Sequence, residues 1–306
     1  MEQDEFNSRA LFPGTLLWHY TDFRGLQGIL AGKLWVSSLP YLNDTAEFSH
    51  GLSIALQVLQ HELEKALHQP SNAAISTVIY RQVVSFFQVS YRPRDVFVAA
   101  FSTKRDDLSQ WRAYGTTGGP QFSIGFSPGA LEAKADEHLF MLEEVKYERQ
   151  HIVPDVTLAL RVSIDSILEE LSRESDLTVE RCGYWAEKLA DEIIAMAPLY
   201  KHPKFEDERE WRLIRRQQVR AGQPSLPLQF RRSGSLVVPY LELPLHAPVT
   251  EIEVFTNLAQ VASPIAAITV GPSPHPEHLQ HAVGEMASRM GIAVRVDTST
   301  VPFRNW

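Results

Sequence analysis

Residues 200–216, YKHPKFEDEREWRLIRR, decide how the fold is interpreted, because charged and apolar side chains alternate in their second half. With the period of two that a strand imposes, a charged set falls on one face and a mainly apolar set on the other. The two sets are Glu208, Glu210 and Arg212 against Arg209, Trp211 and Leu213. The pattern predicts a strand that is packed on one side and meets water or a ligand on the other. The plain alternative is an edge strand whose charges discourage pairing with other chains.

The whole chain has the size and composition of an ordinary globular protein. It has 306 residues, of which 44% are hydrophobic, and a net charge of −8. This acidic balance argues against wide nucleic-acid binding, which needs a basic surface, but leaves room for a small basic pocket. The single cysteine, Cys182, excludes a disulfide framework and a cysteine metal site and fits a reducing compartment.

The first residues of the chain and the length of its apolar runs indicate where in the cell the protein is expected. The first ten residues, MEQDEFNSRA, are acidic and polar, unlike a signal peptide. No window holds 18 consecutive apolar residues, so no segment is expected to span a membrane. We therefore expect a cytoplasmic protein with no membrane partner.

Hydrophobic periodicity divides the chain into an N-terminal tail, 1–15, and one α+β domain, 16–306. Two helical insertions are expected within this domain, at about 45–91 and 151–198. Shorter helices are expected at 22–30, 108–114, 128–136 and 276–290, and Thr21 or Asp22 caps the first of them. A Gly/Pro-rich linker is expected at 220–227.

Short strands are expected along the whole domain, with no regular alternation of strand and helix. They cover residues 16–20, 34–38, 95–102, 121–126, 139–147, 211–215, 236–240, 252–255, 267–270 and 292–296. A doubly wound nucleotide fold is therefore disfavoured, and no phosphate-binding glycine motif is present.

Three places carry side chains that suit a binding site. His19 lies in an otherwise apolar strand, where it is either a hydrogen-bonded core residue or an imidazole at the edge of a cleft. Asn43 and Asp44 either form a turn and helix cap or belong to the site. The third place is the run Trp111-Arg112-Ala113-Tyr114. Its aromatic rings could stack on a flat ligand ring while its guanidinium binds a phosphate. Alternatively, the aromatic rings could fill part of the hydrophobic core.

Other catalytic and metal-binding patterns are weak. His275, His278 and His281 are three apart on one expected helix, but no carboxylate joins them in a known ligand pattern, so no metal site is assigned. There is no GxSxG elbow, and Cys182 has no evident base beside it.

An ordered set of short motifs resembles a bacterial family, domain of unknown function 2971, which is often found near phage-defence genes. The matching motifs span nearly the whole chain from residue 16. They are Leu17-Trp18-His19-Tyr20-Thr21, Leu34-Trp35-Val36-Ser37-Ser38, Asn43-Asp44 with Glu47, Phe101-Ser102, Trp111-Arg112-Ala113-Tyr114, Phe122-Ser123-Ile124-Gly125-Phe126, Val145-Lys146-Tyr147, Lys204, Glu208-Arg209-Glu210-Trp211-Arg212 and Gly271-Pro272.

That family in turn resembles the ADP-ribosyltransferase superfamily, which implies split mixed β-sheets around a cleft that binds NAD as substrate. Three positions of the superfamily's pattern are matched, by His19, by Ser37 or Ser38, and by Glu210. Glu208 supplies the first residue of a Glu-x-Glu tripeptide, which is common by chance. The superfamily's nicotinamide-clamping aromatic has no evident counterpart, and Tyr20, Tyr41, Trp111 and Tyr114 are all candidates.

The resemblance implies roles for these residues. Glu210 would stabilise the oxocarbenium-like ribose, and Glu208 would position the acceptor. His19 would hold the adenosine-side ribose, and Arg112 the pyrophosphate. The remaining expected NAD contacts are Tyr20, Thr21, Ser37, Ser38, Asn43, Asp44, Trp111 and Tyr114.

The expected function is therefore an NAD-dependent ADP-ribosyltransferase, acting as a toxin or phage-defence effector on a macromolecular acceptor, protein or nucleic acid. An inhibitory or triggering partner protein is also expected. Two alternatives stay open: a divalent-metal hydrolase or nuclease using Asp44, Glu208 and Glu210, and a nucleotide-binding sensor module without turnover.

Overall fold

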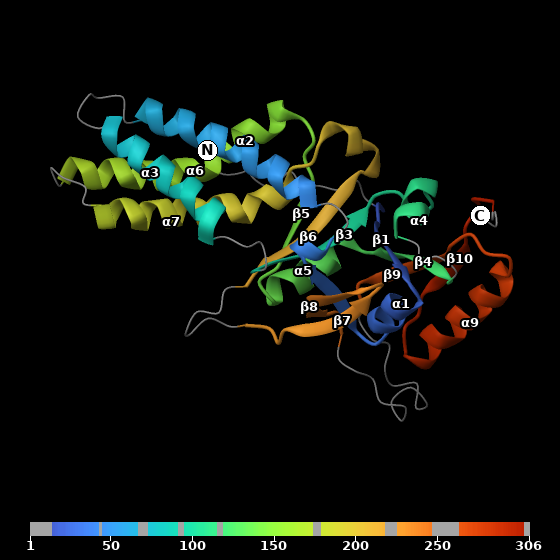
Figure 1. Cartoon of the computed structure of the whole chain (residues 1–306). Coiled ribbons are helices and arrows are strands. Elements are labelled where there is room, and N and C mark those ends of the chain that lie inside the picture. Colours follow the sequence, from blue (N-terminus) through green and yellow to red (C-terminus); the bar gives the residue numbers. More distant parts are fainter. Residues whose placement is uncertain are drawn as a thin grey trace, which may run out of the picture.

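The computed structural model describes residues 14–42, 45–66, 73–90, 95–114, 119–173, 179–217, 225–246 and 263–302. This part of the chain is α+β, as expected, with one mixed sheet and helices packed around it (Figure 1). Asn43, Asp44, the expected strand 252–255 and most of the expected N-terminal tail lie outside the described residues.

Ten strands form the sheet within the described ranges. They are β1 (Leu17–Asp22), β2 (Lys33–Ser38), β3 (Val96–Ser102), β4 (Gln121–Phe126), β5 (Met141–Glu144), β6 (Glu210–Arg216), β7 (Gln229–Ser233), β8 (Leu236–Pro244), β9 (Ile265–Val270) and β10 (Arg295–Thr298). Only β9 and β10 are parallel among these pairs. The strands are joined in one hydrogen-bonded sheet, whereas split sheets were expected.

Strands β1 and β2 separate from each other along one edge of β3, and we call this place the opening of the sheet. β6 pairs with the whole of β3, from Val96 to Ser102, and so occupies the other edge. On the open edge, β2 pairs near Val98 and β1 pairs at Ser102. The two strands therefore pair with different parts of the same edge of β3. The backbone of Ala100 lies between these two parts.

The largest hydrophobic core covers one face of the sheet. Three short helices close it: α1 (Phe23–Leu30), α5 (Pro128–Glu137) and α9 (Pro276–Arg289). The Asp22 carboxylate caps α1 by accepting from the backbone N–H of Gly25 at 2.9 Å. Gly32 follows α1 with φ +83°, where a Cβ would meet the His246 carbonyl oxygen at 2.7 Å, so this helix end needs glycine.

The two expected helical insertions pack together into one four-helix bundle at one end of the molecule (Figure 1). The first contributes α2 (Thr45–Ala66) and α3 (Ala73–Ser85), and the second contributes α6 (Arg149–Arg173) and α7 (Val179–Met196). The bundle has its own apolar core. A smaller apolar cluster, which includes Val98, Ile194 and Ile214, joins the bundle to the second face of β3 and β6.

A further aromatic cluster lies on this second face of β1. It joins Trp18 and Tyr20 to Trp111 of α4 (Leu108–Tyr114). The indole N–H of Trp111 donates to the Asp106 carboxylate at 2.8 Å. The Trp111 side chain is only 4% exposed, so it serves as a core anchor.

Two expectations about the opening stretch are wrong. β6 is an interior strand between β3 and β5, and six of its seven residues are buried, so it is not a charged edge. Glu208 does not share a strand face with Glu210, because it ends the 3-10 helix Pro203–Glu208 and Arg209 turns the chain with φ 44°. Strand β7 was not expected at all.

Candidate functional site

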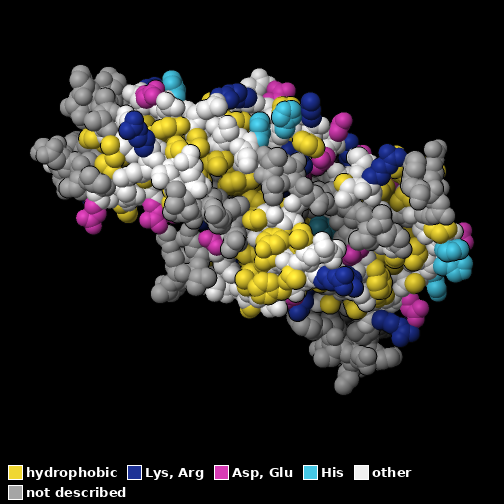
Figure 2. All heavy atoms as spheres, viewed as in Figure 1, with side chains coloured by type: hydrophobic (Ala, Val, Ile, Leu, Met, Phe, Trp, Pro, Cys, Tyr) yellow, Lys and Arg dark blue, Asp and Glu magenta, His cyan; other side chains and the backbone are white. Residues whose placement is uncertain are grey.

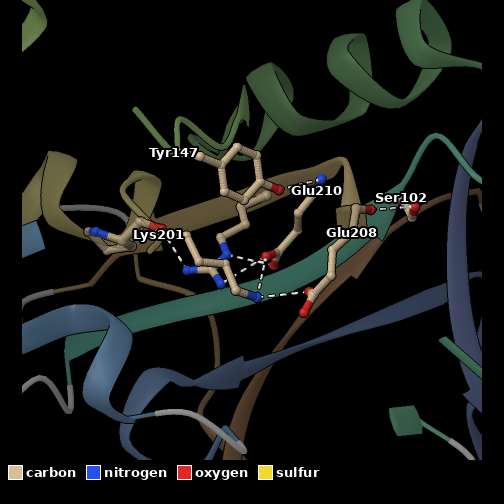
Figure 3. Close-up of polar contacts among 7 residues, drawn as sticks. Ser102, Tyr147, Lys201, Glu208 and Glu210 are labelled. Carbon is tan, nitrogen blue, oxygen red and sulfur yellow. Dashed lines mark hydrogen bonds and ion pairs between the residues drawn. The ribbon is translucent and has the colours of Figure 1, made fainter. Parts of the chain in front are cut away.

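The two carboxylates of the Glu-x-Glu tripeptide, Glu208 and Glu210, both contact the same lysine. Lys201 Nζ lies 2.8 Å from Oε2 of Glu208 and 3.0 Å from Oε2 of Glu210 (Figure 3). Arg212 holds Glu210 from the other side, with Nε 2.6 Å from Oε1 and Nη2 3.0 Å from Oε2. We call these four residues the charge network. Two carboxylates and two cations balance formally, which is how buried charges are tolerated.

The backbone around the charge network is fixed by two hydroxyl groups. The backbone N–H of Glu210 donates to the Tyr147 hydroxyl at 2.9 Å. The Ser102 hydroxyl donates to the Glu208 carbonyl oxygen at 2.7 Å. Because Ser102 also marks where β1 joins β3, it ties Glu208 to the opening of the sheet.

The two carboxylates differ in environment. Burial alone would raise the pKa of Glu210, but the charges of Arg212 and Lys201 and their hydrogen bonds outweigh it and hold the pKa below its ordinary value. The Glu210 side chain is 4% exposed and that of Glu208 is 24% exposed. Glu210 is thus an enclosed, ionised anchor, and Glu208 is the carboxylate that a ligand can reach.

His19 lies at the opening of the sheet. Its Nδ1 is 2.9 Å from the carbonyl oxygen of Ala100, a backbone group on the edge of β3 between the places where β1 and β2 pair. Burial lowers the pKa of His19, the bond to Ala100 acts in the opposite direction, and the charge of Arg231 lowers it further. A neutral ring that donates from Nδ1 keeps a lone pair on Nε2, so His19 can accept a hydrogen bond from a ligand hydroxyl.

His19 and Glu210 do not contact each other. Trp18, Ser102 and Glu210 are in register across β1, β3 and β6, so His19 is one residue out of phase. Its ring packs against Phe101 with centroids 5.6 Å apart, on the face opposite the Glu210 side chain. The two residues would therefore meet different parts of any one ligand.

Ser37 faces a cation that the sequence did not place beside it. Arg231 of β7 donates from Nη2 to the Ser37 hydroxyl at 3.0 Å, and its guanidinium lies 5.6 Å from the centroid of the Trp35 ring. Ser38 is fully buried. Residue pattern alone could not pair Arg231 with Ser37, because their strands are joined only through β8.

The other expected contact residues differ in exposure. The Tyr20 hydroxyl donates to the Lys104 carbonyl oxygen at 2.8 Å and accepts from the backbone N–H of Asp107 at 3.1 Å, while burial raises its pKa to about 12. Thr21 packs against Gly25, where a Cβ would collide with its hydroxyl. Arg112 is exposed on α4, and the side chain of Tyr114 lies outside the described part.

A cavity of about 1520 Å³ lies beside the charge network. Tyr147, Arg209 and Trp211 line one side of it, together with Glu206 and Asp207 of the 3-10 helix. Neither Glu208 nor Glu210 lines it, so this cavity adjoins the charge network without containing its carboxylates.

The described ranges contain neither a metal-binding cluster nor a membrane span. There, no group of three or more His, Cys, Asp or Glu side chains is arranged to hold a metal ion. No helix of that part of the chain combines the length and apolarity needed to cross a lipid bilayer.

Comparison with known proteins gives one family match. No curated protein and no solved structure matches the chain. The matched segment runs from α4 to β6 and contains Trp111, Tyr147 and the whole charge network. Residues 110–213 match the family described as Protein of unknown function (DUF2971), which supports the family expected from the sequence motifs.

Proposed function

We propose that the protein is an NAD-dependent ADP-ribosyltransferase-like enzyme, a toxin or phage-defence effector that modifies a macromolecular target. The observation that carries the proposal is the opening on β3, which is bordered by His19 on β1 and by Ser37 on β2. Between the places where β1 and β2 pair with β3, the edge of β3 offers backbone groups that a ligand could bind. A neutral imidazole and a hydroxyl at its border suit the ribose hydroxyls of a dinucleotide.

The charge network supports the same proposal. Ser102 links the Glu208 backbone to the end of the opening, and Lys201 orients the Glu208 carboxylate. The family resemblance gave the ribose of the nicotinamide end to Glu210, but we assign it to Glu208, which is the more accessible carboxylate. Glu210 is assigned a positioning role, since Arg212 and Lys201 already occupy both of its oxygens.

The chemistry needs only these groups and a nucleophile. The bond between ribose C1′ and the nicotinamide nitrogen breaks, and its electron pair leaves with nicotinamide. A carboxylate that is hydrogen-bonded to the ribose stabilises the positive charge on the oxocarbenium-like ring. The acceptor then forms a new bond to C1′ and loses a proton to solvent or to a nearby base.

The test is nicotinamide release from NAD by the purified protein, with and without cell lysate. Wild type should release nicotinamide, and Glu208→Gln should lower the rate by about 100-fold or more while the protein remains folded at the assay temperature, as a melting curve checks. Glu206→Gln is the matched control, because Glu206 lies in the same 3-10 helix and is exposed. Lysate-dependent release would identify the fraction that holds the acceptor.

Two outcomes would overturn the proposal. Absence of release by wild type under every condition would do so, and NAD binding in that experiment would favour the sensor module. Undiminished release by Glu208→Gln would refute the assigned role of Glu208. The metal-hydrolase alternative has less support, because the carboxylates of both glutamates contact the Lys201 ammonium group.

A further inference from the structure

Arg231 is a partly buried guanidinium with an unusual set of neighbours. Nη2 donates to the Ser37 hydroxyl, and the group lies over the Trp35 ring. Its Nε is enclosed and has no hydrogen-bond partner within the described part of the chain. Burial lowers the pKa of Arg231, although the negative charge of Asp22 acts against it.

No carboxylate in the described ranges forms an ion pair with Arg231. Asp22 is its nearest acidic influence, and one oxygen of Asp22 already caps α1. An arginine kept for structure at such a site would normally meet a carboxylate in a bidentate pair. Arg231 can therefore still donate hydrogen bonds to an anionic ligand.

The position of Arg231 matches the opening of the sheet. Its hydroxyl partner Ser37 borders the opening from β2, and its charge lowers the pKa of His19, which borders the opening from β1. Arg231 itself lies on the β7–β8 hairpin, where Figure 2 shows hydrophobic side chains gathered on the surface. The exposed apolar residues of this hairpin and its approach are Leu228, Phe230, Leu236 and Val237.

We infer that Arg231 and Ser37 form a subsite for a diphosphate group, with the Arg231 Nη donors and the Ser37 hydroxyl binding the phosphate oxygens. The identity of the ligand as NAD rests on the proposed function, whereas the subsite rests on the contacts of Arg231. Sequence reasoning gave the pyrophosphate to Arg112, but Arg112 is exposed on α4 and Arg231 lies at the opening.

Calorimetric titration with ADP-ribose, inorganic pyrophosphate and adenosine tests the subsite. Arg231→Gln should weaken ADP-ribose binding by about 10- to 100-fold, the loss expected for charge-assisted hydrogen bonds. Adenosine, which has no phosphate, should bind equally to both proteins. Arg231→Lys should fall between wild type and Arg231→Gln, since an ammonium cannot reproduce the planar fork.

Arg232→Gln is the matched control. Arg232 is the next residue of β7, is exposed, and donates from Nε to the Gly234 carbonyl oxygen at 3.1 Å. This variant should bind ADP-ribose like wild type. Equal ADP-ribose affinity for Arg231→Gln and Arg232→Gln, or no ADP-ribose binding by wild type, would overturn the inference. An equal loss for pyrophosphate and ADP-ribose supports it as well and would show that the diphosphate alone is recognised.

The inference and the proposed function fail in different ways. If nicotinamide release proceeds with an unchanged KM in Arg231→Gln, the subsite is refuted and the enzyme activity stands. If ADP-ribose binding depends on Arg231 but no nicotinamide is released, the subsite stands and the enzyme activity is refuted. Melting curves of Arg231→Gln and Arg231→Lys show whether the binding losses come from unfolding.

Discussion

The ammonium nitrogen of Lys201 lies 3.0 Å from Oε2 of Glu210, and both side chains are 4% exposed. Lys201 precedes the 3-10 helix Pro203–Glu208, and Glu210 follows it as the first residue of β6. The buried pair therefore joins the two ends of the segment that presents Glu208. Any chemical role of Glu208 depends on this pair.

Lys201→Met should destabilise the protein by roughly 3 kcal/mol, because it leaves a buried carboxylate with one cation fewer. This loss of unfolding free energy is at the lower end of the range for broken buried ion pairs, since Arg212 still pairs with Glu210. Urea unfolding measures it. Lys146→Met is the control, because the Lys146–Asp155 pair is more than one-third exposed on both sides and should contribute less than about 1 kcal/mol. Equal losses for the two variants would contradict the structural role of the buried pair.

Histidine 19 predicts a pH dependence of stability. Its folded-state pKa is lowered from 6.5, so between that lowered value and pH 6.5 the unfolded chain binds more protons than the folded one. Stability should be full above pH 6.5 and decline as the pH falls below it. Urea midpoints measured from pH 5 to 8 should decline less in His19→Asn than in wild type, since asparagine has no proton to gain there. Burial also lowers the pKa of His50, so the difference between the two proteins is the informative quantity.

Two helical glycines should respond in opposite ways to alanine. A Cβ at Gly51 of α2 would collide with the Ala197 carbonyl oxygen, where the bundle meets the segment after α7, so Gly51→Ala should lower the melting temperature. A Cβ at Gly183 of α7 would meet nothing within 4 Å, so Gly183→Ala should stabilise the protein by about 0.5–1 kcal/mol. A stabilising Gly51→Ala would show that α2 is packed differently.

Aspartate 106 connects α4 to the segment after β10. Its carboxylate accepts from the Trp111 indole at 2.8 Å and from the Thr300 backbone N–H and hydroxyl at 2.7 and 2.8 Å. Asp106→Ala should cost roughly 2–3 kcal/mol in unfolding free energy, because the indole N–H loses a charged acceptor inside the protein. Asp136→Ala, on the exposed face of α5, should change stability by less than about 0.5 kcal/mol. Loss of hydrogen-exchange protection in α4 would accompany the first change only.

The helices were predictable because their signals are local. The Asp22 cap, the glycine after α1 and the long periodic runs of α6 and α7 all lie within a few residues of the ends they define. The packing of the two insertions into one bundle was not predictable. An apolar stripe indicates which face of a helix is buried, but not which element packs against that face. Strand β7 was missed because its residues are mostly exposed and lack alternation.

The site was predictable only in part, for the same reason. Glu208 and Glu210 were proposed from the family resemblance, yet the strand period wrongly placed them on one face, because Arg209 turns the chain between them. Lys201 and Arg231 carry no periodic signal, and their partners are defined by tertiary contacts with Glu210 and Ser37. Charged residues are usually exposed, so a sequence gives no warning that such a residue is enclosed.

The four-helix bundle is assembled from the two insertions, and this has a consequence for synthesis on the ribosome. α2 and α3 emerge early, but α7, which completes their core, ends only at Met196. At typical translation speeds the first two helices wait roughly 5–20 s with an uncovered apolar face. During that interval the nascent chain is a natural client for chaperones that hold unfinished helices, and a pause in translation before residue 179 would prolong its exposure.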